Sequence, residues 1–282
     1  MNRMTDKTVP KLAGFACLLA LVSGGAALAG GAVDPDRGTD PPSHGKDEQM
    51  TPNGSHGETE QHPVRGLAVA EDELRVVVDD PELRRGATER LSFRIVDTRG
   101  ETVEDFELAH EKRMHLILAR RDLTGFQHLH PSQAPDGTWT TDVRIEDAGS
   151  YRMFADFTRA GEPHTLGADL RVDGPADLRP LPAPADSAKS DGGYDVRLER
   201  DGEMLRFAIS RDGQPVETEP YLGAGGHLVV LREGDMAFLH VHPEEDGVSF
   251  MTELPSPGRY RMFLQFKHEG RVQTVAFTED AR

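Results

Sequence analysis

Two halves of this chain repeat each other, and this repetition constrains the fold more than any other feature of the sequence. Residues 114–131 align without a gap with residues 226–243, and 7 of the 18 positions are identical. Each segment has a His-Leu pair at its second and third positions and closes on His-x-His-Pro. A later block is also shared, Gly149-Ser-Tyr-Arg-Met-Phe154 in one half and Gly258-Arg-Tyr-Arg-Met-Phe263 in the other. The sequence therefore predicts two copies of one module.

Each module is expected to consist of β-strands. Apolar residues alternate with other residues in Leu91-Ser-Phe-Arg-Ile95 and again in Leu205-Arg-Phe-Ala-Ile209, which is the period of a half-buried strand. Asp-Gly and Arg-Gly pairs mark turns between the strands. Tyr151 and Tyr260 each follow a Gly turn, as the corner tyrosine of a sandwich does. The predicted fold class is all-β, with two tandem immunoglobulin-like or cupredoxin-like antiparallel sandwiches.

The N-terminal residues resemble an export signal. A basic start is followed by an apolar run and by Ala27-Leu-Ala29, which fits a signal-peptidase site. An uncleaved membrane anchor is the alternative, and a membrane is an expected partner only in that case. The sequence thus predicts a secreted, envelope or periplasmic protein. The predicted segments are a signal peptide (1–29), a disordered linker (30–63), the first sandwich (64–174), a Pro-rich linker (175–192) and the second sandwich (193–282).

Charge and cysteine content exclude several functions. The net charge of −17 disfavours nucleic acid as a partner, because phosphates would be repelled. A single Cys permits neither an intrachain disulfide nor a Cys-based zinc site. Twelve His residues remain as the unusual feature of the composition.

The repeated histidines are predicted to share one face of a hairpin in each module. In the second module a two-residue turn at Gly234-Asp235 would place His227 opposite His242, with His240 beside them. Opposed Cβ atoms lie about 4.5–5.5 Å apart, so three such imidazoles can meet one ion.

The first module repeats this arrangement. A turn at Asp122-Leu123 would place His115 opposite His130, with His128 beside them. Neutral imidazoles are good ligands for copper or zinc, which predicts one metal site per repeat. The additional candidate ligands are Met153, Met262 and His110. Asp156 is a candidate partner that would orient a ligand imidazole.

A second interpretation needs no metal. Each His could be a structural group, hydrogen-bonded to a loop carbonyl, and the protein would then be a non-catalytic structural or interaction protein of tandem sandwiches. An enzyme is not expected, because no nucleophile elbow, phosphate loop or paired-carboxylate pattern is present in the sequence.

The quoted histidine blocks resemble a segment of secreted or membrane-tethered bacterial proteins described as heavy-metal-binding-domain or YtkA-like. The resemblance spans most of both modules and rests on His115-Leu with Phe126-Gln-His-Leu-His-Pro131, and on His227-Leu with His240-Val-His-Pro243. It implies a β-sandwich with a link to copper or another heavy metal outside the cytoplasm. The function expected from the histidines is buffering or handling of this metal, with an envelope protein as a candidate partner. The ligands it implies are His115, His128, His130, His227, His240 and His242.

Overall fold

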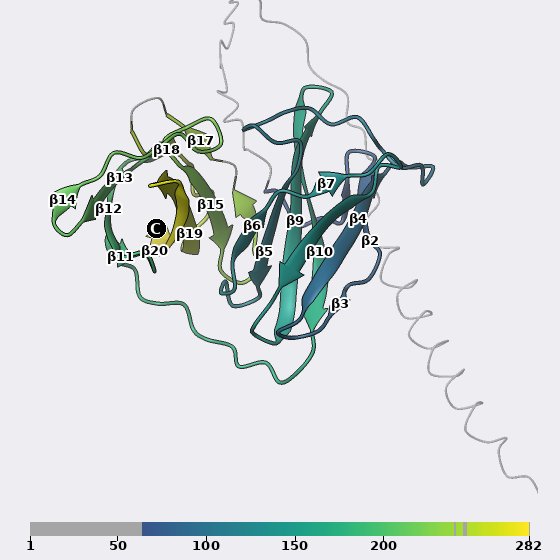
Figure 1. Cartoon of the computed structure of the whole chain (residues 1–282), viewed down its shortest axis with the longest axis horizontal. Coiled ribbons are helices and arrows are strands. Elements are labelled where there is room, and N and C mark those ends of the chain that lie inside the picture. The colour runs from purple at the N-terminus through teal and green to yellow at the C-terminus, as the bar shows by residue number, and fades with distance from the viewer. Residues whose placement is uncertain (1–63, 240, 245–246, 282) are drawn as a thin grey trace, which may run out of the picture. The chain divides into compact units, whose positions relative to one another are not determined.

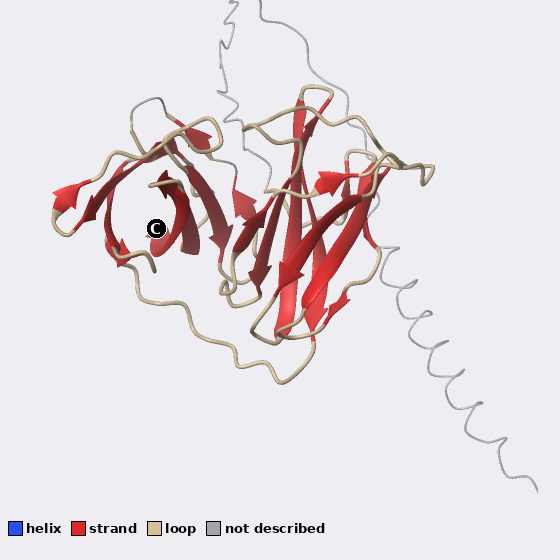
Figure 2. Cartoon of the chain, in the orientation of Figure 1, coloured by secondary structure: helices blue, strands red, loops and turns tan. Residues whose placement is uncertain are grey.

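The computed structural model describes residues 64–239, 241–244 and 247–281 (Figure 1). The predicted signal peptide and the linker at 30–63 lie outside these residues. The described part of the chain contains strands and loops and no helix (Figure 2). Accordingly, it offers no helix with the length and apolar character needed to cross a membrane. The predicted fold class, all-β with two tandem immunoglobulin-like or cupredoxin-like antiparallel sandwiches, is confirmed.

The first sandwich pairs two five-stranded sheets, in the orders β1-β2-β4-β8-β7 and β3-β10-β9-β5-β6. Its neighbouring strands are antiparallel except for the short pair of β3 with β10. The strands are β1 (Ala70–Glu71), β2 (Leu74–Val78), β3 (Glu82–Leu83), β4 (Thr88–Val96), β5 (His115–Arg120), β6 (Gln127–Leu129), β7 (Ser132–Gln133), β8 (Trp139–Arg144), β9 (Gly149–Arg159) and β10 (Glu162–Val172).

The second sandwich repeats this design with sheets β11-β12-β13-β18-β17 and β16-β15-β19-β20, and β14 pairs with β13. Its first strand begins at Ser187, within residues 175–192 that the sequence predicts as a Pro-rich linker. The strands are β11 (Ser187–Lys189), β12 (Tyr194–Asp201), β13 (Met204–Arg211), β14 (Gln214–Pro215), β15 (His227–Arg232), β16 (Phe238–Leu239), β17 (His242–Pro243), β18 (Ser249–Met251), β19 (Gly258–His268) and β20 (Arg271–Ala281).

The alternating pattern places apolar side chains inside each sandwich. Leu91, Phe93 and Ile95 of β4 are buried in the first core, and Leu205 and Phe207 of β13 are buried in the second. This confirms the predicted strands, because burial of alternate residues requires the extended period of two.

A corner tyrosine closes each sandwich, as predicted. The Tyr151 hydroxyl donates a hydrogen bond to the Asp147 carbonyl over 2.9 Å, and the Tyr260 hydroxyl donates to the Ser256 carbonyl over 2.8 Å. Both rings are fully buried, so each hydroxyl needs the partner that the corner supplies.

Strands β5 and β15 are buried on both faces. Their even-numbered leucines and valine face the core of their own sandwich, whereas Ile117 and Val229 face a third apolar cluster shared by both repeats. We call this cluster the interface core. Its buried members are Ile117, Ala119, Leu123, Phe154, Leu181, Val229, Leu231, Met236, Phe238 and Phe263. The interface core joins the two sandwiches through equivalent faces of the repeat.

The hairpin registers that the sequence predicted are confirmed by the strand pairs. Ile117 lies opposite His128 in the first repeat, and Val230 lies opposite Leu239 in the second. The predicted two-residue turns are wrong, because both loops are wider. Arg232 N donates to Ala237 O, and the backbone between them uses positive φ at Gly234 (97°).

The interface core yields a stability prediction. The Phe263 ring stacks on Phe126, with ring centroids 4.1 Å apart, and is 4% exposed. Phe263→Ala should lower the free energy of unfolding by about 3–5 kcal/mol, because it leaves a cavity between the sandwiches. Urea denaturation measures this, with Val272→Ala at an exposed site as the control. A loss under about 1 kcal/mol would show that the interface is not close-packed.

Candidate metal centre

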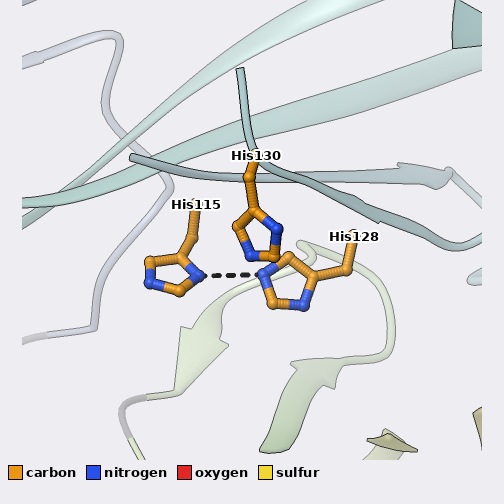
Figure 3. A group of neighbouring side chains, drawn as sticks. All are labelled: His115, His128 and His130. Atoms are coloured by element: carbon orange, nitrogen blue, oxygen red, sulfur yellow. Dashed lines mark hydrogen bonds between the residues drawn. The ribbon is translucent and has the colours of Figure 1, made fainter. Parts of the chain in front are cut away.

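Three imidazoles of the first repeat converge on one point. His115 begins β5, His128 lies in the middle of β6, and His130 follows β6 by one residue. Continuing the observed register places His115 opposite His130, and all three side chains leave the same face of the hairpin. One ring nitrogen from each residue lies within 4.8 Å of the others, an arrangement that could hold a metal ion (Figure 3). The predicted triad is therefore assembled.

Partners outside the triad fix the protonation of two rings. His115 Nε2 lies 3.1 Å from the Ala109 carbonyl oxygen, which can only accept, so Nε2 carries the hydrogen. His128 Nδ1 lies 2.6 Å from Gln265 Oε1 and donates to it. The Gln265 amide is oriented by its Nε2, which donates to Thr274 Oγ1 over 3.2 Å.

These tautomers direct two lone pairs at each other. In the neutral rings the remaining nitrogens, His115 Nδ1 and His128 Nε2, carry no hydrogen, yet they lie 3.0 Å apart. His130 Nε2 is buried without a hydrogen-bond partner among the described residues. Two acceptors thus face each other without a donor, an unpartnered nitrogen of His130 belongs to the same cluster, and a cation would satisfy these nitrogens.

The spacing suits a transition metal. Bonds of about 2.0–2.1 Å at tetrahedral angles separate neighbouring ligand nitrogens by about 3.3 Å. The triad's nitrogen separations, from 3.0 Å for His115 and His128 up to 4.8 Å at most, bracket that value. Small side-chain rotations would bring all three nitrogens to an ion.

The surroundings keep the rings neutral. Burial, together with the neighbouring His115, lowers the pKa of His128 to about 3 and that of His130 to about 4. Burial also lowers the pKa of His115, where Lys112 adds to the effect. At neutral pH the three imidazoles are therefore unprotonated and available as ligands.

His227 of the second repeat lies beside this triad. Its ring stacks on His115, with centroids 5.6 Å apart and an interplanar angle of 8°, and on His128 at 4.8 Å. Burial, followed by the charges of the neighbouring histidines, lowers the pKa of His227 well below its usual value. The exposed His110 forms edge-on ring pairs with His115 and His227, with ring centroids 6.1 and 6.0 Å apart.

Other predicted ligands have different positions. Met153 and Met262 are wholly buried inside their own sandwiches, on the strand faces opposite to the histidines, so the prediction that they are ligands is wrong. The alternation of side chains along a strand explains this position. Phe154 and Phe263, one residue later, are the side chains that face the interface core. The ring of His240 and the side chain of His242 lie outside the described residues, and their predicted role stays a prediction.

The orienting residue that the sequence analysis missed is Gln265. Asp156, the predicted orienting residue, lies opposite His115 in the sheet and accepts a hydrogen bond from Thr165 Oγ1 over 2.6 Å. Gln265 and Thr274 occupy the equivalent positions of the second repeat, so aligning the repeats around Asp156 would have indicated Gln265.

The family named Domain of unknown function (DUF8832) matches residues 68–174 and 188–282, one match for each repeat, and the chain belongs to this family. No curated protein matches it.

Solved structures resemble the chain only loosely. The chain is similar to Salmonella alpha-2-macroglobulin at 13% identity and a TM-score of 0.28, over 77% of this chain and 15% of that one. It is similar to an Escherichia coli adhesin at 12% identity and a TM-score of 0.26, over 74% of this chain and 65% of that one. The chain is also similar to the tandem Ig repeats of Dlar, at 8% identity and a TM-score of 0.21, over 73% of this chain and 95% of that one.

The depressed pKa values predict how the metal-free protein responds to acid. Unfolded histidines bind protons below about pH 6.5, whereas folded His128 resists protonation down to a pKa of about 3. The contribution of His128 to the free energy of unfolding is therefore fully present above pH 6.5. Below that pH it falls by about 1.4 kcal/mol per pH unit. Urea denaturation at pH 7 and pH 5 measures the slope.

The control for this prediction is His128→Ala, which should make the pH dependence between pH 7 and pH 5 less steep, while the other buried histidines keep part of the slope. An equal slope in the wild type and the variant would show that His128 does not resist protonation in the folded state.

Proposed function

We propose that this protein binds one transition-metal ion, copper or zinc, through His115, His128 and His130, and that it buffers or handles this ion outside the cytoplasm. The observation that carries the proposal is the pair of unprotonated nitrogens 3.0 Å apart, each held in that state by an outer partner. Such outer partners are typical of histidines that bind metal, since they fix the tautomer and raise the basicity of the ligand.

The ligand set narrows the choice of ion. Neutral imidazoles suit zinc and copper, whereas calcium and magnesium prefer oxygen ligands. The two methionines that were candidate ligands, Met153 and Met262, lie in the sandwich cores, so these thioethers, which would have favoured Cu(I), do not reach the site. Zinc and Cu(II) are therefore the ions to test first.

The proposed location and role rest on the sequence. Residues 1–29 have the pattern of a signal peptide, so the site would meet the metals of the envelope or the exterior. The resemblance to secreted heavy-metal-binding-domain and YtkA-like proteins supports the same location, and an envelope protein is the candidate recipient of the ion. We propose binding and not catalysis, because the sequence contains no recognised catalytic motif.

A structural role is the second candidate, and one observation favours it. The His128–Gln265 hydrogen bond and the stacked His227 ring join the two sandwiches without any ion. In this account the histidines stabilise a tandem scaffold that presents surfaces at the cell envelope.

Metal-dependent stability separates the two candidates. Zinc at a free concentration of 100 times its dissociation constant should stabilise the tag-free protein by about 2.7 kcal/mol, because only the folded state holds the triad together. His128→Ala should abolish the shift in the urea midpoint. His268→Ala is the matched control, since His268 bonds the Tyr194 hydroxyl away from the cluster. Identical midpoints with and without zinc and Cu(II) would favour the scaffold.

The orienting residue gives a finer test. Gln265→Leu removes the acceptor of His128 Nδ1–H and should weaken zinc binding by about 10–100-fold, because the tautomer is no longer fixed. Gln265→Glu retains an acceptor oxygen and should stay close to the wild type. Calorimetric titration measures both, and a folded Gln265→Leu protein with unchanged affinity would contradict the orienting role.

A further inference from the structure

We propose that His227, from the second sandwich, is the fourth ligand of the ion, so that a closed shell of four imidazoles joins the two repeats. This inference rests on the proposed function and goes beyond it, because it turns a site within one repeat into a site shared by both. Its consequence is that an ion cannot be fully bound unless the two sandwiches are docked.

The spacing of the four rings supports this assignment. Four imidazoles bound tetrahedrally to one ion have ring centroids about 5 Å apart, given metal–nitrogen bonds of about 2.0–2.1 Å. The separations from His115 are 5.2 Å to His128, 5.1 Å to His130 and 5.6 Å to His227. His128 lies 4.8 Å from both His130 and His227. The ring of His227 therefore lies nearly as close to His115 and His128 as the rings of the triad lie to one another.

Besides the small rotations of the triad, the ring of His227 has to turn. It stacks flat on His115, with an interplanar angle of 8°, so a face and not a nitrogen is presented to the triad. Within the described ranges no hydrogen bond holds this ring, and rotation about its side-chain bonds would direct a nitrogen at the ion. The backbone is already fixed, because His227 pairs with Gln265 in the ladder of β15 and β19.

The second sandwich thus supplies two functions from one cross-strand pair. Gln265 fixes the tautomer of His128, and His227 would complete the coordination. The interface core holds β15 in place, since Val229, on the same face as His227, is 1% exposed. Docking of the repeats and occupancy of the site are therefore linked, and each should favour the other.

A closed shell also assigns the site to a class. Catalytic zinc sites keep one position open for water or substrate, whereas closed sites with four protein ligands hold the ion without activating water. Four imidazoles therefore favour storage or buffering of the ion, and release would require His227 to turn away.

The test counts imidazoles around zinc in the full-length protein by X-ray absorption at the zinc edge. We expect four imidazoles in the wild type and three in His227→Ala. Loss of an outer partner already weakens binding by about 10–100-fold, so loss of this ligand should weaken it by at least about tenfold. His227→Gln, closer in volume, repeats the measurement if the alanine variant does not fold, and His268→Ala is the control histidine in the same sandwich.

The outcomes separate the two proposals. Four imidazoles that fall to three in both His227 variants, with weaker binding, support the inference. Zinc bound by three imidazoles in the wild type, or a His227→Ala protein with unchanged affinity and count, overturns it and leaves the triad site intact. A wild-type protein that binds no zinc and no Cu(II) overturns the proposed function, and the inference with it.

Discussion

The interface core between β5 and β15 is the interaction on which the rest of this structure depends. Each strand uses one face for its own sandwich and the other for its partner repeat, so both are buried on two sides. Burial of this apolar surface joins the repeats by the hydrophobic effect. It also decides where the histidines lie, because His115 and His227 begin these two strands on the same faces as Ile117 and Val229.

Burial then sets the chemistry of the histidines. Removing water disfavours the charged imidazolium, which keeps His128 and His130 neutral at physiological pH. A buried acceptor without a donor costs about 1–3 kcal/mol, so the opposed nitrogens of His115 and His128 are unfavourable without a cation. The same packing that makes the metal-free cluster unfavourable makes a bound ion favourable, and it ties that ion to the docked repeats.

The sequence predicted much of the fold because its signals are local. Alternation identified the strands around Phe93 and Phe207, and the Gly-Tyr blocks identified both corners. The register that joins His115, His128 and His130 followed from the repeat, and a register is preserved even when the loop is wider than expected.

The sequence could not show that the two hairpins face each other. An outward-facing Ile117 or Phe263 looks the same in a strand whether it meets solvent, a partner protein or a second repeat. For this reason the histidines were assigned to one site per repeat, whereas the structure brings His227 to the triad of the first repeat. The sequence also could not indicate that the Ala109 carbonyl accepts a hydrogen bond from His115, because any residue can supply a backbone carbonyl.

The most direct test of a single shared centre is the metal content of the tag-free protein after reconstitution with zinc and removal of the excess, determined by elemental analysis against protein concentration. The account predicts one ion per chain. Two ions per chain would contradict the shared centre, and none would contradict the existence of a metal site.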